Sequence, residues 1–461
     1  MERVRPPVPD AGQRKSWWLW LFAIAGVALA ARMCLVFWLP TAPVDDFWSY
    51  LARAENLYQK GVYGPFPDYP DASYPPAYPL LLAGALSFGG EPLLTAKIVN
   101  AGLAFLSVLL AGCLGKALGG PAVGLLAASL VAILPRGLLA SQILASENLL
   151  QPVLFAFFLL AVSSSRRTHP WVRGTVAGLL LGIGTLTRVS TYALGVVWPL
   201  AARLTGRRRW ARELTLLLLV QHVVLLPWAL RNESTLGARL WLTSSGGINL
   251  FIGNHDGADG GWVFWRDSLS RVVPNLEAMN SVEIDSAARV AALTWIHRNP
   301  RRTLQLFVTK MHRLVFENER YLVFYSVDGK GGAPLPTIRE VLPGEHFLKS
   351  HNRQLLLFLT GIYAATGVIA VFAIGIVLVT ILLGRRSRRL PRPTILLLGT
   401  GAAYYLIVAS VFFAATRFRW PAMDLLTIVT ATVLNLRPER GAGDRINTLA
   451  APTFASVGRS R

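Results

Sequence analysis

Charged residues are scarce in this chain. Only 15% of its 461 residues are Asp, Glu, Lys or Arg, whereas 53% are hydrophobic. That balance is too apolar for an ordinary soluble domain. The lack of charge leaves continuous apolar runs of roughly 15–25 residues, the length that crosses a bilayer. Because the runs are continuous rather than alternating, they predict membrane-spanning helices rather than the strands of a barrel.

Cysteine and acidic residues are also in short supply. The two cysteines, Cys34 and Cys113, both fall inside apolar runs, so no disulfide framework is expected in the loops. The 25 acidic residues face 46 basic ones, a formal net charge of +21. In a soluble protein this excess would suggest nucleic acid. Here the basic residues collect in short segments between apolar runs, as cytoplasmic loops require, and we expect no nucleic-acid partner.

Several signatures of catalysis are missing. The chain has no phosphate-binding glycine loop, no HExxH and no paired CxxC. His255, Asp256 and Asp259 have the residue types of a metal site. They lie in the glycine-rich stretch from Gly246 to Gly261, however, so turn geometry explains them more simply.

The basic segments also predict the topology. The first apolar run is too long for a removed signal peptide, so we expect it to be a retained first span. Because Arg14 and Lys15 precede it, the amino terminus is placed inside. With spans alternating from there, the other basic loops also fall inside. The fold class expected is therefore an all-α polytopic membrane protein with about ten transmembrane helices. The expected spans are 17–39, 92–115, 121–140, 148–162, 172–187, 188–201, 213–230, 355–383, 394–413 and 421–435.

These spans divide the chain into parts. Residues 1–230 are expected to form an N-terminal transmembrane catalytic module that contains a first outer loop at 40–91. Residues 231–354 form a large outer loop region, 355–435 the C-terminal spans and 436–461 a cytoplasmic tail. The protein is expected to be a multi-pass protein of the inner (plasma) membrane with its working face on the periplasmic or extracellular side.

Amphipathic stretches in the outer segments predict helices that lie in the membrane interface. In 47–60, apolar side chains recur at helical spacing, and a second such helix follows Tyr74-Pro75-Pro76-Ala77-Tyr78-Pro79. Further along, 283–297 reads as a polar helix and 301–318 as an interfacial one.

Charged groups at the outer ends of the spans are the candidate site, because burying them near lipid is costly without a use. Asp45 and Asp46 begin the first outer loop. One of them could simply cap the helix that starts at Phe47, which the spacing alone favours. Alternatively, partial burial beside a second carboxylate would raise the pKa of one acid and make it a general base.

Basic residues at the same boundary run against the positive-inside trend. Arg188, Arg417 and Arg419 suit a phosphate, which a guanidinium grips with paired hydrogen bonds. Snorkelling to lipid headgroups, or pairing with Glu147 or Asp424, accounts for them equally well. Lys97, one turn into the second span, is a further candidate that snorkelling also explains.

With these residues in view, the chain resembles the GT-C membrane glycosyltransferases. The similarity is to the group that holds protein O-mannosyltransferases, the aminoarabinose transferase of lipid A and lipopolysaccharide-core transferases. It covers nearly the whole chain in order. It is carried by Asp45-Asp46-Phe47-Trp48-Ser49-Tyr50, the segment from Tyr74 to Pro79, Ser146-Glu147, Leu186-Thr187-Arg188, the segment from Pro227 to Asn232, the Gly246–Gly261 loop and Arg417-Phe418-Arg419-Trp420-Pro421.

The resemblance implies an inverting transfer of a hexose or pentose from a polyprenyl-phosphate donor to a glycan, lipid or protein acceptor. It implies Asp45 as the base, with Asp46, where many members have Glu, in support. Glu147 and Tyr74 would be supporting residues. Tyr74 departs from the aminoarabinose branch, which has a basic residue there, so phosphate binding would rest on Arg188, Arg417, Arg419 and Lys97.

Some alternatives stay open at this point. The sequence does not decide whether a cofactor takes part: a divalent metal could bridge Asp45 and the donor phosphate, but the convergent ligands are few. A secondary transporter or lipid flippase is the main rival function. Those proteins usually show internal repeats and midplane ionisable residues, whereas the unusual charges here are at the outer rim. A non-catalytic membrane scaffold would need no such convergence.

Overall fold

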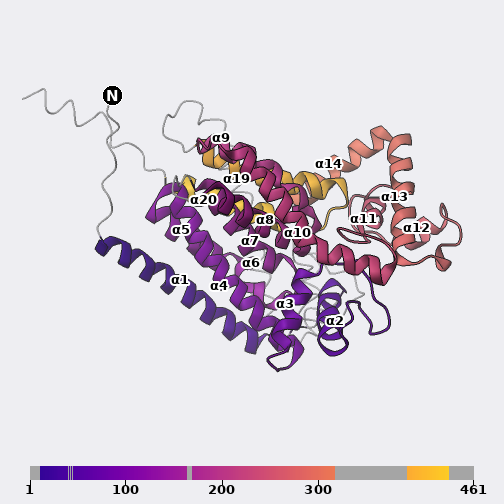
Figure 1. Cartoon of the computed structure of the whole chain (residues 1–461), viewed down its shortest axis with the longest axis horizontal. Helices are drawn as coiled ribbons and strands as arrows, with labels where there is room; N and C mark the ends of the chain where they lie inside the picture. Colours follow the sequence, from indigo (N-terminus) through magenta and orange to yellow (C-terminus); the bar gives the residue numbers. More distant parts are fainter. Residues whose placement is uncertain are drawn as a thin grey trace, which may run out of the picture.

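The structure, a computed structural model, describes residues 11–163 except 40, 42 and 44, residues 169–316, and residues 392–435. Within these ranges the secondary structure is helical and contains no strand (Figure 1), which confirms the all-α prediction for this part of the chain. The predicted span at 355–383 and the tail at 436–461 lie outside the described residues.

Three helices of the described part are long and apolar enough to cross a membrane: α1 (Ala11–Trp38), α4 (Pro92–Gly119) and α10 (Trp210–Leu236). Large apolar side chains on their surfaces remain exposed, such as Phe37 at 70% and Val223 at 59%. Side chains of this kind are stable facing lipid, so the chain is a membrane protein. The total of ten spans stays a prediction. The remaining helices of the bundle are α7 (Glu147–Val162), α8 (Pro170–Thr187), α9 (Val197–Leu204), α19 (Arg392–Val411) and α20 (Trp420–Leu434).

The predicted span at 121–140 is broken in the structure. It consists of α5 (Pro121–Ile133) and α6 (Pro135–Leu139), the latter continuing into the 3₁₀ turn η1 (Ala140–Gln142), with a bend of 59°. Leu134 leaves the helical region at ψ 141°, because a following proline disfavours that region. Asn148 donates from Nδ2 to the carbonyls of Ala140 (3.0 Å) and Ile143 (2.6 Å). It thereby satisfies backbone groups that the break leaves open.

The pair of spans predicted at 172–187 and 188–201 meets at Arg188. Here the backbone is extended, with φ −155° and ψ 119°, and α8 ends at Thr187. The second member differs from the prediction, because it begins as the 3₁₀ helix η2 (Val189–Val196) and becomes α-helical only in α9. The corner puts the Arg188 side chain at the end of the bundle.

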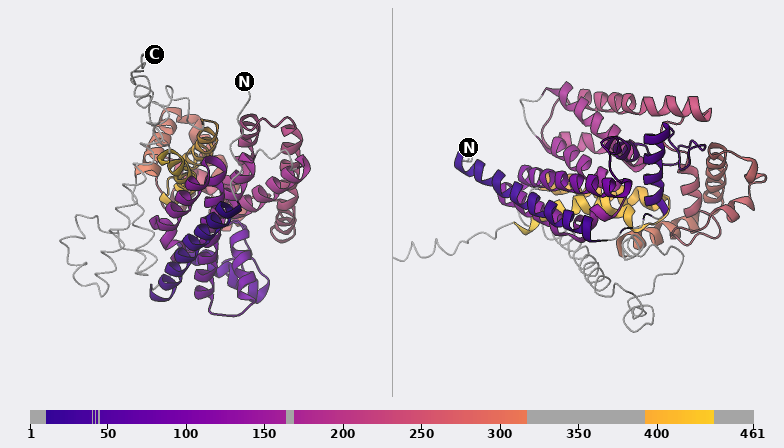
Figure 2. Two further views of the ribbon diagram at one scale, coloured as in Figure 1. Left: turned by 90° about the vertical axis from the view of Figure 1, so that its left-hand side faces the viewer. Right: turned by 90° about the horizontal axis from the view of Figure 1, so that it is seen from below.

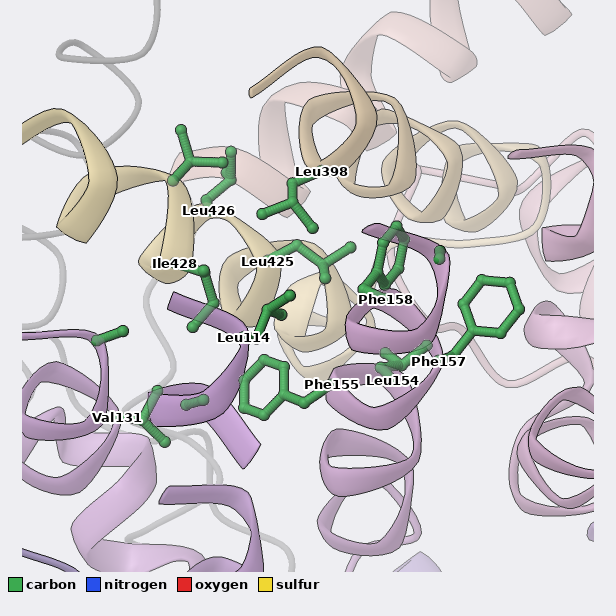
Figure 3. Close-up of a cluster of buried hydrophobic side chains, with 14 of the residues drawn as sticks. Leu114, Val131, Leu154, Phe155, Phe157, Phe158, Leu398, Leu425, Leu426 and Ile428 are labelled. Atoms are coloured by element: carbon green, nitrogen blue, oxygen red, sulfur yellow. The ribbon is translucent and has the colours of Figure 1, made fainter. Parts of the chain in front are cut away.

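The core of the bundle lies where α4, α5, α7, α19 and α20 meet. Figure 3 shows Phe155 and Phe158 of α7 beside Leu114 of α4 and Leu425 of α20, and all of these are buried. Van der Waals packing of this kind, rather than exclusion of water, joins helices within a membrane.

A stripe of small residues lets α8 approach α10 closely. Gly174, Gly178 and Gly182 face α10, and a Cβ added at Gly178 would lie 2.6 Å from the carbonyl oxygen of Leu217. Spacing of small residues by four positions is a common way for membrane helices to bring their backbones together.

The segments that the sequence places outside form the predicted helices. α2 (Asp45–Lys60) buries Phe47, Tyr50, Leu51 and Ala54 on one face, as the amphipathic spacing predicts, and α3 (Ala77–Leu86) follows the prolines. The polar helix is α13 (Ser281–Arg298), and α14 (Pro300–Phe316) follows it. Two short elements, α12 (Arg266–Ser270) and η3 (Leu276–Ala278), precede α13.

Part of the glycine-rich stretch is helical, which the sequence reading did not anticipate. α11 (Gly246–Gly253) begins where the backbone amides of Gly247 and Ile248 donate to Asp285 Oδ1, at 2.6 and 3.0 Å. A carboxylate at this position stabilises a helix start, and here α13 supplies it. Figures 1 and 2 place α11, α12 and α13 together at one end of the molecule.

We expect Gly178→Leu to lower stability by about 1–3 kcal/mol, because the added side chain must push α8 away from α10. The apparent melting temperature in detergent measures this. Gly26→Leu on α1 is the control, since a Cβ at Gly26 meets nothing within 4 Å. Equal effects of the two substitutions would contradict the close approach.

Candidate functional site

Four chain segments that are distant in sequence converge at one end of the bundle. Asp46 near the start of α2 forms an ion pair with Arg417, which lies in the 3₁₀ turn η4 (Thr416–Arg419) before α20. Glu147, the first residue of α7, forms an ion pair with Arg188 after the last residue of α8. These are the ends that the sequence placed on the outer side, and the structure brings them together.

Asp46 has two partners. The Tyr74 hydroxyl donates to its Oδ1, and Arg417 pairs with its Oδ2. The Tyr74 ring is held in turn by an edge contact with Tyr50, with centroids 5.3 Å apart, and by the Arg53 guanidinium, 4.4 Å from its centroid. Burial raises the pKa of Tyr74, so its hydroxyl remains protonated and a donor at neutral pH. Tyr74 thereby fixes the orientation of the carboxylate.

Asp45, the residue expected to be the base, is the first residue of α2 and directly precedes Asp46. Its backbone therefore lies beside the cluster. Its catalytic role stays a prediction.

Glu147 is buried, with 1% of the residue exposed. Besides Arg188, its carboxylate accepts a hydrogen bond from Ser146 Oγ at 3.4 Å, and Ser146 Oγ lies 3.1 Å from the Tyr50 hydroxyl. A polar chain thus runs from α7 to α2.

Phe418 holds both arginines. The Cζ atom of Arg188 lies 4.3 Å from the centroid of the Phe418 ring, and that of Arg417 lies 5.5 Å from it. Each contact has the geometry of a cation–π interaction. One aromatic ring therefore keeps two guanidinium groups close to each other.

A third ion pair joins the cluster through Arg136, which the sequence reading missed. Arg136 of α6 pairs with Asp424 of α20, 288 positions away. It also donates to the backbone carbonyl of Glu147 at 3.3 Å, and its guanidinium lies 4.7 Å from the ring of Trp420. A basic residue at the outer end of an apolar run was the signal that singled out Arg188, and Arg136 carries it as well.

Lys97 and Arg419 have partners elsewhere. Lys97 Nζ donates to the carbonyl of Leu39, just after α1, at 2.9 Å. Arg419 Nη1 donates to the carbonyls of Leu314 (3.0 Å) and Val315 (3.2 Å) in the last turn of α14. Both are buried, and both satisfy carbonyls that a helix end leaves open.

No group of three or more His, Cys, Asp or Glu side chains in the described ranges is arranged to hold a metal ion. The two partners of Asp46 described above are a phenol and a guanidinium, which are not ligands of a hard cation.

A cavity of about 580 Å³ adjoins the cluster, between the loop that follows α2 and the C-terminal half of α10. Leu80, Leu186 and Val224 form an apolar wall, and Asp68 and Arg231 are among its polar lining residues. Leu186 is two positions from Arg188, so the cavity reaches the neighbourhood of the ion pairs.

No family model matches the chain, and no curated protein matches it. Among solved structures, it is similar to the archaeal oligosaccharyltransferase AglB from Archaeoglobus fulgidus in complex with an inhibitory peptide and a dolichol-phosphate. The identity is 14%, the match covers 90% of this chain and 50% of that chain, and the TM-score is 0.48. The apo form of the A. fulgidus oligosaccharyltransferase gives 15% identity, the same coverage and a TM-score of 0.49.

ArnT from Cupriavidus metallidurans bound to undecaprenyl phosphate is similar at 14% identity, with 90% of this chain and 76% of that chain covered and a TM-score of 0.41. The chain spans about half the length of the oligosaccharyltransferases. AglB and ArnT are GT-C glycosyltransferases, the group that the sequence resembles.

We expect Glu147→Ala to destabilise the protein by about 3–5 kcal/mol, because it leaves the Arg188 charge without its buried partner. The apparent melting temperature in detergent is the measurement. Glu233→Ala is the matched control, because Glu233 pairs with Arg239 on the surface, where both side chains are about half exposed. Its cost should be at most about 1 kcal/mol. A melting temperature as high for Glu147→Ala as for the control would contradict the assigned pair.

Proposed function

We propose that the chain is an inverting glycosyltransferase that moves a hexose or pentose from a polyprenyl-phosphate donor to a hydroxyl acceptor at the outer face of the membrane. The observation that carries the proposal is the placement of Arg188 and Arg417 against one ring, beside the acidic start of α2. The acceptor would be a cell-envelope glycan, a lipid or a protein.

The arginine pair is suited to a phosphate diester. Two guanidinium groups held close together repel each other unless anions lie between or beside them, and Asp46 and Glu147 supply such anions in the structure. A phosphate can take the same paired hydrogen bonds as a carboxylate. Because the pair is fixed by Phe418, it would stabilise negative charge that develops on the departing phosphate without rearranging.

The acidic start of α2 supplies the other half of the chemistry. In the proposed reaction Asp45 takes the proton of the acceptor hydroxyl, whose oxygen bonds to the anomeric carbon. The bond from that carbon to the phosphate oxygen breaks, and its electron pair leaves with the polyprenyl phosphate. A single displacement inverts the anomeric centre and needs one base and no covalent intermediate. Asp46, oriented by Tyr74 and Arg417, would hold the start of α2 in position.

The position of the cluster suits a lipid-linked donor. It lies at the ends of helices of the bundle, and in the proposed arrangement these ends are level with the phosphates of the membrane lipids. The apolar wall of the adjoining cavity, which includes Leu80 and Leu186, would tolerate hydrocarbon next to it. Membrane lipid is therefore both the surroundings and the source of the donor.

The direct test is consumption of donor by purified protein. Wild-type protein, given labelled dolichol-phosphate or undecaprenyl-phosphate sugars with candidate acceptors, should release the lipid phosphate. Asp45→Asn should keep the fold and lose roughly two or more orders of magnitude in rate, because it removes the base. Asp46→Asn should be milder. Near wild-type turnover of Asp45→Asn would remove that residue from the mechanism.

The same preparation tests the rival function. A secondary transporter or flippase in vesicles would move the labelled lipid or its sugar across the bilayer without breaking the bond to phosphate. Translocation with intact donor would favour that alternative over the transferase.

A second prediction concerns Arg417. Arg417→Lys should weaken donor binding although the charge stays, because a lysine cannot make the bidentate contact. Arg417→Ala should raise the activation free energy of turnover by about 2–4 kcal/mol, since the contact acts mainly on the departing phosphate. Donor affinity and turnover, measured beside the melting temperature, check both.

The matched control is Arg266→Lys, which changes an exposed arginine that pairs with Glu277 in the outer segment. It should bind and turn over donor as the wild type does. Unchanged kinetics in Arg417→Lys would mean that Arg417 only anchors Asp46 or contacts lipid headgroups.

A further inference from the structure

The segment that carries Arg417 is tied to the outer segment by a set of polar contacts. Residues 412–419 connect α19 to α20. At the near end, the carbonyl of Val411 accepts from Asn254 Nδ2 at 3.0 Å and from Lys310 Nζ at 3.5 Å. In the middle, the amide of Ala414 donates to the carbonyl of Gly260 at 2.8 Å. At the far end, Arg419 binds the last turn of α14.

Lys310 is the unusual member of this set. It lies on α14, outside the helices that are long and apolar enough to span, and only 1% of the residue is exposed. Its amine donates to Asn254 Oδ1 at 3.2 Å and to Val411, and no carboxylate of the described residues pairs with it. Burial lowers the pKa of Lys310 to about 8. A buried amine without an acid is costly, so an apolar side chain would serve better if packing alone mattered.

The surroundings of Lys310 are shaped around the contact. Asn254 accepts from Lys310 and donates to the same Val411 carbonyl that Lys310 reaches, which closes a small polar ring. Gly253 lies directly against the 412 peptide: a Cβ there would collide with the Phe412 carbonyl and lie 3.0 Å from Lys310 Nζ. Glycine at this position therefore lets the two segments meet.

We propose that Lys310, with Asn254, is a positioning residue that fixes the 412–419 segment so that Arg417 faces Asp46 and the donor phosphate. This inference rests on the proposed function, because it assigns Arg417 to the donor. Lys310 acts through the backbone at Val411, six positions before Arg417, and touches no reacting atom. Small displacements of a group that binds the reacting centre reduce rates and affinities steeply. The contacts of Lys310 and Asn254 with Val411 would therefore affect function as well as stability.

The test measures the Kd of undecaprenyl phosphate for the full-length protein, together with the melting temperature. Lys310→Met keeps roughly the length and the burial of the side chain and removes the amine that donates hydrogen bonds to Asn254 and Val411. Its Kd should rise about tenfold, because Arg417 is no longer held in place. Arg313→Met is the matched control: Arg313 lies on the same helix, is partly exposed and pairs with Asp259, so its Kd should stay within twofold of wild type.

A double-mutant cycle separates positioning from general damage. If Lys310 acts through Arg417, Lys310→Met combined with Arg417→Ala should bind no more weakly than Arg417→Ala alone. Additive losses, or a Lys310→Met protein with wild-type Kd, would overturn the inference while leaving the role of Arg417 intact. An unchanged Kd in Arg417→Ala alone would instead overturn the proposed function.

A second variant covers the case in which Lys310→Met does not fold. Asn254→Ala removes the other donor to Val411 and the acceptor of Lys310, and the same rise in Kd and the same non-additivity with Arg417→Ala are expected. If both variants fail to give folded protein, the polar ring is a requirement of folding and the proposed role is wrong.

Discussion

Charge placed near lipid has to be neutralised, and the end of the bundle that carries the candidate site is organised by that requirement. Glu147 and Arg188 are both largely buried, as are Arg136 and Asp424, and each charge is paired with the other sign. Breaking any of these pairs would leave a charge in surroundings that cannot solvate it. The pairs therefore fix how α6, α7, α8 and α20 end relative to one another, and they assemble the candidate site.

The short turn around Phe418 contacts two different parts of the structure. The ring of Phe418 contacts the guanidinium groups of Arg188 and Arg417, while Arg419 on the same turn donates hydrogen bonds to the last carbonyls of α14. Arginines alternating with an aromatic residue thus point to two different places. The three basic residues look alike in the sequence, but in the structure Arg417 and Arg188 pair with Asp46 and Glu147, whereas Arg419 binds carbonyls of α14.

Local patterns in the sequence predict local structure well here. The spacing of Phe47, Tyr50, Leu51 and Ala54 predicts the buried face of α2, because helical periodicity depends on neighbours only. Partners distant in sequence are not encoded in this way, so the pairing of Arg136 with Asp424 and the use of Lys97 on the Leu39 carbonyl became visible only in the fold. The helix α11 was missed because its start is stabilised by Asp285 from another helix rather than by its own glycines.

The acidic and basic halves of the site are linked by the Asp46–Arg417 pair, and this has a consequence for the proposed reaction. A donor phosphate that takes hydrogen bonds from Arg417 competes with Asp46 for the same guanidinium. Tyr74 donates to the other carboxylate oxygen, so Asp46 would keep one of its two partners during such an exchange. Donor binding would therefore leave the acidic start of α2 in place, next to the arginine that holds the phosphate.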